Sequence, residues 1–304
     1  MPFKILHLTD LHDGHPENDG LLSRELDQLP ANAGLAPDDR AILLVTGDVI
    51  DFPDAGLLER SSSLLRGFQD RTGIPVVVVP GNHDMEDYRF GLDYLQTPGG
   101  WNAQKRAFAE AFAWTVRPEG SPLLETLHAP METVPGCSYR IDRARDDRGR
   151  ELLFVGLDTV AEDAAFAGGI LGAGQLARLE QDLSELAGRD ASSRLVLHLH
   201  HSPVIGWPGM ALRDARELSE VIHRSGARID FLLFGHTHEG LAHDREPFHG
   251  TGRHLGIPHA LDGGCLNPDV GPVLRFAEWL EGSRPRRAFR VIQPWDEPAV
   301  RDLP

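Results

Sequence analysis

The sequence has little cysteine and no long apolar segment, and both absences narrow the class of protein. Cys137 and Cys265 are its only cysteines, which excludes a disulfide scaffold and a zinc site built from thiolates. No apolar run approaches the roughly 18 residues that a membrane-spanning helix needs. The first residues lead directly into a strand-like pattern and do not have the shape of a signal peptide. We therefore expect a cytoplasmic protein with no membrane partner.

Positive charge is also scarce. Asp and Glu number 46 against 30 Lys and Arg, which gives a formal net charge of −16. Because the neutralisation of backbone phosphates supplies most of the non-specific affinity for nucleic acids, this charge argues against a nucleic-acid partner. Hydrophobic residues make up 41% of the 304 residues, so the chain can bury a large core by itself.

The first third of the chain alternates between strand and helix patterns. Near-continuous apolar runs at residues 5–9, 41–46 and 74–79 predict strands that are covered on both faces. Apolar residues at helical spacing over 21–29 and 57–68 predict helices between these strands. This alternation is typical of a layered α/β protein.

We expect one domain over residues 1–304. Residues 87–136, with Trp101 and Trp114, predict an insertion or lid at the site entrance, where the two rings either pack in the core or stack on a nucleobase. Residues 275–304 predict a peripheral strand and tail. Further strands are predicted at 138–142, 151–157, 194–199 and 229–234, and further helices at 103–113, 173–186 and 214–225.

Five of the predicted strands end in the same kind of polar chemistry. In open α/β folds the carboxyl ends of the strands are where ligand sites assemble, so these side chains are expected to converge. The polar groups are Asp10-Leu11-His12, Gly47-Asp48-Val49-Ile50-Asp51, Gly81-Asn82-His83-Asp84, His200-His201 and Gly235-His236-Thr237-His238.

These side chains are metal-ligand types, and they suit manganese, iron, zinc or cobalt. Asp10 and His12 lie two residues apart, so both project to the same side of an extended strand end, and His236 and His238 share that spacing. Seven ligands with one shared carboxylate, Asp48, are typical of a two-metal centre whose ions lie about 3.5–4 Å apart. An Asp-x-His or Gly-Asp motif alone is more often a cap or a turn, and Gly-Asn-His-Asp is a stronger signal, but the five motifs in this order predict a metal site.

The ordered motifs resemble the calcineurin-like metallophosphoesterase superfamily, whose signature is Asp-x-His, Gly-Asp-x-x-Asp, Gly-Asn-His-Asp, His-His and Gly-His-x-His. The resemblance spans residues 10–238. Residues 8–12, 45–48, 79–84 and 199–203 look most similar to bacterial class III cyclic-nucleotide phosphodiesterases. The resemblance implies an α/β fold, a four-layer α/β/β/α sandwich with two mixed sheets, and metals at the strand ends between the sheets.

The resemblance also implies which residues bind the two ions. The family ligand is the first histidine of the pair that precedes a proline-containing turn, which selects His200. His198 is then left to the core or to the surroundings of the ligands, and His201 to packing or substrate contact. The implied ligands are Asp10, His12 and His238 at metal one and Asn82, His200 and His236 at metal two, with Asp48 bridging.

The implied chemistry is hydrolysis of a phosphoester by a water that the two ions activate. His83 matches the acid that protonates the leaving group in this superfamily. Asp84 is expected to hold the His83 ring in the right tautomer and to keep it protonated. The alternative role for His83 is to orient the attacking water only. Asp51 is expected to brace its loop without binding metal.

The motif after the second strand favours a diester substrate. The protein-phosphatase branch has arginines that clamp the extra charge of a monoester, whereas here Asp51 is followed by Phe52-Pro53. We therefore expect a small phosphodiester, such as a cyclic nucleotide or a glycerophosphodiester. Arg89 is close enough in sequence to contact a phosphate, which keeps a phosphomonoesterase as an alternative.

Two further alternatives differ more strongly. The acidic net charge argues against a nuclease of the same superfamily, and the complete set of ligand positions argues against a non-catalytic scaffold. The loop after residue 238 carries further histidines, which we expect to be exposed and not to form a third metal site. These are His243, His249, His254 and His259.

Overall fold

The structure is a computed structural model. It describes residues 3–86, 100–116, 123–132, 134–160, 167–204, 210–243, 248, 256–267, 288–296 and 299–302. No helix in these ranges is long and apolar enough to cross a membrane.

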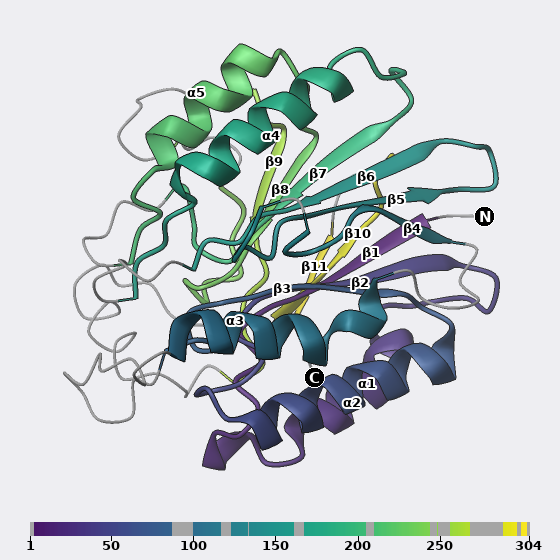
Figure 1. The fold of residues 1–304 in the computed structure, drawn as a ribbon. Coiled ribbons are helices and arrows are strands. Elements are labelled where there is room, and N and C mark those ends of the chain that lie inside the picture. Colours follow the sequence, from purple (N-terminus) through teal and green to yellow (C-terminus); the bar gives the residue numbers. More distant parts are fainter. Residues whose placement is uncertain are drawn as a thin grey trace.

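Two mixed sheets lie face to face and helices cover their outer sides, as expected for a four-layer α/β/β/α sandwich (Figure 1). The first sheet has five strands in the order β11-β10-β1-β2-β3, and the second has six in the order β4-β5-β6-β7-β8-β9. The first sheet contains β1 (Phe3–Leu8), β2 (Arg40–Thr46), β3 (Val76–Val79), β10 (Ala288–Ile292) and β11 (Ala299–Asp302). The second contains β4 (Leu124–His128), β5 (Arg140–Arg145), β6 (Glu151–Gly156), β7 (Arg194–His198), β8 (Phe231–Phe234) and β9 (His259–Asp262).

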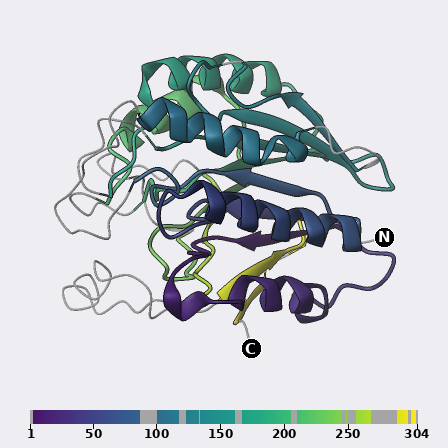
Figure 2. The ribbon, with the colours of Figure 1, turned by 60° about the horizontal axis from the view of Figure 1, so that its bottom comes forward.

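The helices divide between the two outer faces. Figure 2 shows the same layers from a second direction. Helices α1 (Leu21–Asn32), α2 (Ala55–Thr72) and α3 (Gly100–Ala111) lie on the side of the first sheet, and α4 (Gly172–Leu186) and α5 (Ala215–Ser225) cover the second. Two short 3-10 helices, η1 (Pro16–Asn18) and η2 (Ala113–Thr115), complete the described elements.

Helix α2 illustrates how local sequence sets these elements. Asp54 caps its amino end, because the carboxylate accepts the N–H of Leu57 at 2.9 Å. Gly73 ends the helix with φ 70°, a conformation that glycine adopts without a steric cost. Between these ends, Leu58, Leu65 and Phe68 face the core.

Apolar side chains fill three layers. One cluster lies between the two sheets, where Ile5, Leu44 and Val77 of the first sheet meet Phe154 and Leu233 of the second. The other two clusters lie between each sheet and its helices. Most strands are therefore covered on both faces, which explains their continuous apolar sequences.

The strand register brings the candidate site residues to one edge. Strands β1, β2 and β3 are parallel, with Leu8 opposite Val45 and Val45 opposite Val78, so all three end at the same level. Strands β6 to β9 are also parallel, with His198 opposite Leu233. Because parallel strands end at the same edge, the polar loops that follow them meet between the sheets.

The C-terminal part of the chain differs from the predicted single peripheral strand. Strand β10 lies inside the first sheet, antiparallel to β1, with Phe289 and Ile292 almost fully buried. Of these two C-terminal strands, only β11 lies at an edge of the sheet. Strands β4 and β9 were not predicted, because each is short and lies in a stretch with scattered polar residues.

Helix α3 belongs to the region predicted as an insertion or lid. Lys105 of this helix makes a buried ion pair of 2.7 Å with Asp158, which follows β6 of the second sheet. Trp114 donates its indole N–H to Ser62 of α2 at 2.8 Å, so this ring packs against the body of the protein. Residues 87–99 and the Trp101 side chain lie outside the described residues, and a lid role for this region stays a prediction.

We expect Lys105→Ala to lower the free energy of unfolding by ~3 kcal/mol, because it leaves a buried carboxylate without its cation. Urea unfolding at equilibrium measures this change. Arg106→Ala, the exposed neighbour on the same helix, is the control and should change stability little. Equal stabilities of the two variants would contradict a contribution of the Lys105–Asp158 pair.

Candidate metal centre

The backbone of the convergent loops is strained at the predicted ligands. Six non-glycine residues in the described part of the chain have positive φ, and five of them are predicted ligands. Such conformations cost roughly 1–3 kcal/mol each and are kept where the surroundings enforce them, often at functional sites. The five are Asp10 (52°), His12 (44°), Asp48 (50°), His236 (71°) and His238 (57°).

Hydrogen bonds between neighbouring loops hold this conformation. The N–H groups of Leu11 and His12 donate to the carbonyl of Asp48 at 2.8 and 3.0 Å, which joins the loops after β1 and β2. The N–H of His236 donates to the Asp10 carboxylate at 2.9 Å, which joins the loop after β8. Gly81 approaches so closely that a Cβ there would collide with Asp48. The loops therefore form one packed unit that spans both sheets.

One half of the site contains Asp10, His12 and His238. Nε2 of His238 lies 2.8 Å from Oδ1 of Asp10 and 3.3 Å from Nε2 of His12. Nδ1 of His12 lies 3.3 Å from the Asp51 carboxylate. A metal-binding histidine commonly has its second ring nitrogen beside a carboxylate or carbonyl, so His12 fits this pattern.

The other half contains Asn82, His200 and His236. Nε2 of His200 lies 3.0 Å from Oδ1 of Asn82 and 3.3 Å from Oδ2 of Asp48. Its Nδ1 donates to the Thr46 carbonyl at 2.8 Å. The His236 ring lies 5.0 Å from the His200 ring, and its buried Nε2 makes no hydrogen bond. This half also has the features of a metal site.

The two halves share Asp48. Its carboxylate lies 3.3 Å from His200 and 3.9 Å from His12, so it is placed between them. Within the described residues, metal-compatible groups form around both halves, with Asp10, His12 and His238 in one and Asp10, Asp48 and His200 in another. The donors present therefore fit two cations with one shared carboxylate. The fold brings all seven predicted ligands together, and their individual roles as ligands remain predictions.

The electrostatics also favour cations here. Burial would raise the pKa of Asp48, but the neighbouring His200 and His83 hold that pKa well below its usual value. Burial favours a neutral His200 ring, yet the Asp48 carboxylate raises the pKa of His200 to about 9. The two buried carboxylates of Asp10 and Asp48 thus draw positive charge to this point of the molecule.

The contacts of Asp84 differ from those expected of a partner for the His83 ring. Its carboxylate accepts the backbone N–H groups of Ile50 at 3.0 Å and Gly81 at 2.8 Å, and so joins two loops. Burial and the nearby Asp48 charge raise the pKa of Asp84 to about 7. The orienting partner of the His83 ring is Asp51: its carbonyl lies 2.8 Å, and its carboxylate 3.9 Å, from Nδ1 of His83. Sequence adjacency suggested Asp84, but both of its carboxylate oxygens accept backbone N–H groups.

The remaining histidines have different surroundings. His201 is buried and its Nδ1 lies 2.7 Å from the hydroxyl of Thr159, with its ring 4.5 Å from the His236 ring. His198 is buried between the sheets. His259 stacks on Phe231 within the second sheet.

The structure describes only some of the other residues that the sequence analysis singled out. His243 is buried, and it lies 3.6 Å from Glu239, so the expectation of exposure is wrong for this residue. Among the described residues, the metal-compatible groups include neither His243 nor His259. Arg89, His249 and His254 lie outside the described residues.

The sequence analysis missed Asp262. This buried residue ends β9 and its carboxylate accepts hydrogen bonds from the loop that carries His236 and His238. The signal was present, because Asp262-Gly263-Gly264 follows an apolar pair in the same way as the other strand-end motifs.

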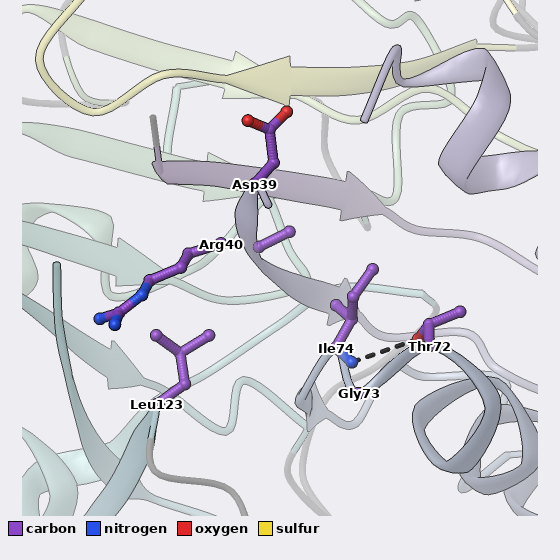
Figure 3. Close-up of a pocket in the computed structure, with 7 residues that line it drawn as sticks. Asp39, Arg40, Thr72, Gly73, Ile74 and Leu123 are labelled. Atoms are coloured by element: carbon purple, nitrogen blue, oxygen red, sulfur yellow. Dashed lines mark hydrogen bonds between the residues drawn. The ribbon is translucent and has the colours of Figure 1, made fainter. Parts of the chain in front are cut away.

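A cavity of about 220 Å³ lies at the opposite end of β2 (Figure 3). Its charged groups already have partners, because Asp39 pairs with Lys4 and Arg40 pairs with Asp147. This cavity therefore lacks the convergent, unsatisfied donors that distinguish the metal centre. Its lining residues are Asp39, Arg40, Ala41, Thr72, Gly73, Ile74 and Leu123.

We expect Mn²⁺ to raise the thermal unfolding midpoint by a few degrees. An ion that binds only the folded chain stabilises it by about 2.7 kcal/mol at a concentration 100-fold above its Kd. Differential scanning calorimetry measures the shift, and a chelator should reverse it. The double variant Asn82→Ala, His238→Ala should lose it. An unchanged midpoint of the wild-type protein in millimolar Mn²⁺ would contradict the metal centre.

Comparison with known proteins agrees with this geometry. The family model described as calcineurin-like phosphoesterase matches residues 3–240. No curated protein sequence gives a significant match.

Two solved structures show weak likenesses to this chain. The sulfate thiohydrolase SoxB of Thermus thermophilus, in complex with glycerol, has a TM-score of 0.48 and 15% identity. That alignment covers 100% of this chain but 56% of SoxB, so the chain spans little more than half of that protein. The catalytic domain of CcCel6A has a TM-score of 0.32 and 11% identity, with coverages of 83% and 72%. The assignment rests on the sequence match, which spans most of the 304 residues: the chain belongs to the calcineurin-like phosphoesterase family.

Proposed function

We propose that this protein hydrolyses small phosphodiesters, of the cyclic-nucleotide or glycerophosphodiester type, at a dinuclear metal centre. Membership of the calcineurin-like phosphoesterase family implies metal-dependent hydrolysis of phosphoesters. The observation that supports the two-metal form most directly is Asp48, which lies between a group around Asp10 and a group around His200.

The cationic side chains near the centre bear on whether the substrate is a diester or a monoester. A phosphodiester carries one negative charge and a monoester carries up to two at neutral pH, so monoester sites benefit from added cationic side chains. In the described part of the chain, no arginine or lysine is hydrogen-bonded or ion-paired to any of the seven predicted ligands. The short motif resemblances to class III cyclic-nucleotide phosphodiesterases point to the same substrate class.

The proposed substrate is small, and the proposed setting is the cytoplasm. The net charge of −16 makes a long polyanion a poor partner, because phosphate binding then lacks its usual electrostatic gain. Imidazole, carboxylate and amide donors without thiolate suit manganese, iron, zinc or cobalt as the two ions.

When bound, the two ions would supply an activated water and neutralise charge on the phosphoryl oxygens. Other residues of the chain orient the side chains that would hold these ions. Asp51 fixes the His12 ring from one side, and the Thr46 carbonyl fixes the His200 ring from the other. Strained backbone at Asp10 and Asp48 keeps both carboxylates aimed into the centre before substrate arrives.

His83 has the position of a proton donor to the leaving group. Its side chain is 23% exposed, whereas those of Asp48 and His12 are 2% and 3% exposed, so His83 lies at the open side of the centre. Nδ1 donates to the Asp51 carbonyl at 2.8 Å, which fixes the orientation of the ring. The Asp51 carboxylate lies 3.9 Å from the same ring nitrogen, so Asp51 contacts His83 through both its backbone and its side chain.

The Mn²⁺-loaded protein should hydrolyse bis-p-nitrophenyl phosphate at least ~10-fold faster, in kcat/KM, than p-nitrophenyl phosphate, a ΔΔG‡ of about 1.4 kcal/mol. Release of p-nitrophenol measures both rates. Asn82→Ala should abolish both activities, and Asn102→Ala, an exposed amide on α3, should leave them unchanged. Preference for the monoester would contradict the proposal and indicate a phosphatase, and degradation of oligonucleotides at low enzyme concentration would indicate a nuclease.

His83→Ala should slow the hydrolysis of diesters with alkyl leaving groups by roughly 10²–10⁴-fold. The loss should be far smaller for p-nitrophenyl diesters, whose leaving group needs no proton. Steady-state rates on the two substrate types give the comparison. His223→Ala, an exposed histidine of α5, is the control. Equal losses on both substrate types would show that His83 does not act as the acid.

A further inference from the structure

The loop Gly235–Gly240 has a demanding conformation. It follows β8 and carries two predicted ligands, with φ of 71° at His236, 57° at His238 and 61° at Gly240. Its two histidines point to different halves of the centre, since His236 groups with His200 and His238 groups with Asp10 and His12. Two left-handed non-glycine residues so close together need external support to persist.

Asp262 provides contacts along this loop. It is fully buried at the end of β9, directly opposite Phe234 at the end of β8. One carboxylate oxygen accepts the hydroxyl hydrogen of Thr237, the residue between the two histidines. The other accepts the N–H of Gly240 at 3.3 Å and the N–H of Gly264 at 2.7 Å. The carboxylate therefore joins the middle and the end of the loop to β9.

Backbone contacts flank the same loop on both sides. The N–H of Gly263 donates to the Phe234 carbonyl at 3.0 Å, just before the loop begins. The N–H of Asp262 donates to the Leu241 carbonyl at 3.0 Å, just after the loop ends. These bonds fix the ends of the loop, but they do not reach the segment between the two histidines. Only the carboxylate contact to Thr237 does so in the described hydrogen-bond network.

We infer that Asp262 is a positioning residue of the metal centre, which acts through the Thr237 hydroxyl and the Gly240 N–H to direct His236 and His238 toward different ions. A buried carboxylate is costly unless several donors satisfy it, and here the loop supplies two of its three donors. The inference rests on the dinuclear centre of the proposed function and is independent of the substrate.

The test uses Thr237, because Asp262→Ala would also leave the buried N–H groups of Gly240 and Gly264 without their acceptor and destabilise the fold. Thr237→Val removes the hydroxyl and keeps the shape of the side chain, and Thr237→Ser keeps the hydroxyl. We expect Thr237→Val to weaken Mn²⁺ binding by about 10–100-fold, as is common when a group that orients a ligand is lost. Thr237→Ser should bind Mn²⁺ within about 3-fold of the wild-type protein.

Isothermal titration with Mn²⁺ measures the affinities, and electron paramagnetic resonance of the loaded proteins detects the spin coupling of paired ions. Loss of the coupled signal in the valine variant and its retention in the serine variant would support the inference. Wild-type affinity in the valine variant would overturn it, and so would equal losses in both variants, since the hydroxyl would then be irrelevant.

The same measurements separate this inference from the proposed function. A wild-type protein that binds no Mn²⁺ would overturn the dinuclear centre and this inference with it. A wild-type protein that binds two Mn²⁺ ions but hydrolyses neither phosphate ester would overturn the proposed function alone, and the comparison of the Thr237 variants would still decide the role of Asp262.

Discussion

Two buried carboxylates, Asp10 and Asp48, meet a group of imidazole rings between the two sheets, and most of the local structure serves this contact. Buried anions are costly unless they are paired, hydrogen-bonded or bound to a cation. Here the carboxylates accept backbone N–H groups and face His200 and His238. This concentration of negative charge and imidazole nitrogen is the physical basis for binding two cations.

The four layers give this charged centre a rigid frame. Apolar side chains between the sheets fix the distance between β1, β2 and β3 on one side and β7 and β8 on the other. Helices on the outer faces cover the strands, so the strand ends are the places where polar side chains gather. Since the loops are hydrogen-bonded to one another, the backbone holds the predicted donors in one arrangement.

A group of polar residues around the predicted ligands supports this arrangement. Thr46 and Asp51 lie beside the ring nitrogens that face away from the centre, and Asp84 and Asp262 bind the backbone of the loops. Each joins two segments that are distant in sequence. The geometry of the predicted ligands therefore depends on these supporting contacts.

The sequence alone determined the order of the strands and helices in the first third of the chain and the identity of the polar groups that follow the strands. It could do so because continuous apolar runs and strand-end motifs are local patterns. Tertiary structure alone decided that Asp51, and not Asp84, lies beside His83, that Asp262 supports the loop of His236, and that β10 lies inside the first sheet. These facts depend on the direction of turns and on pairings between distant segments, which no local pattern encodes.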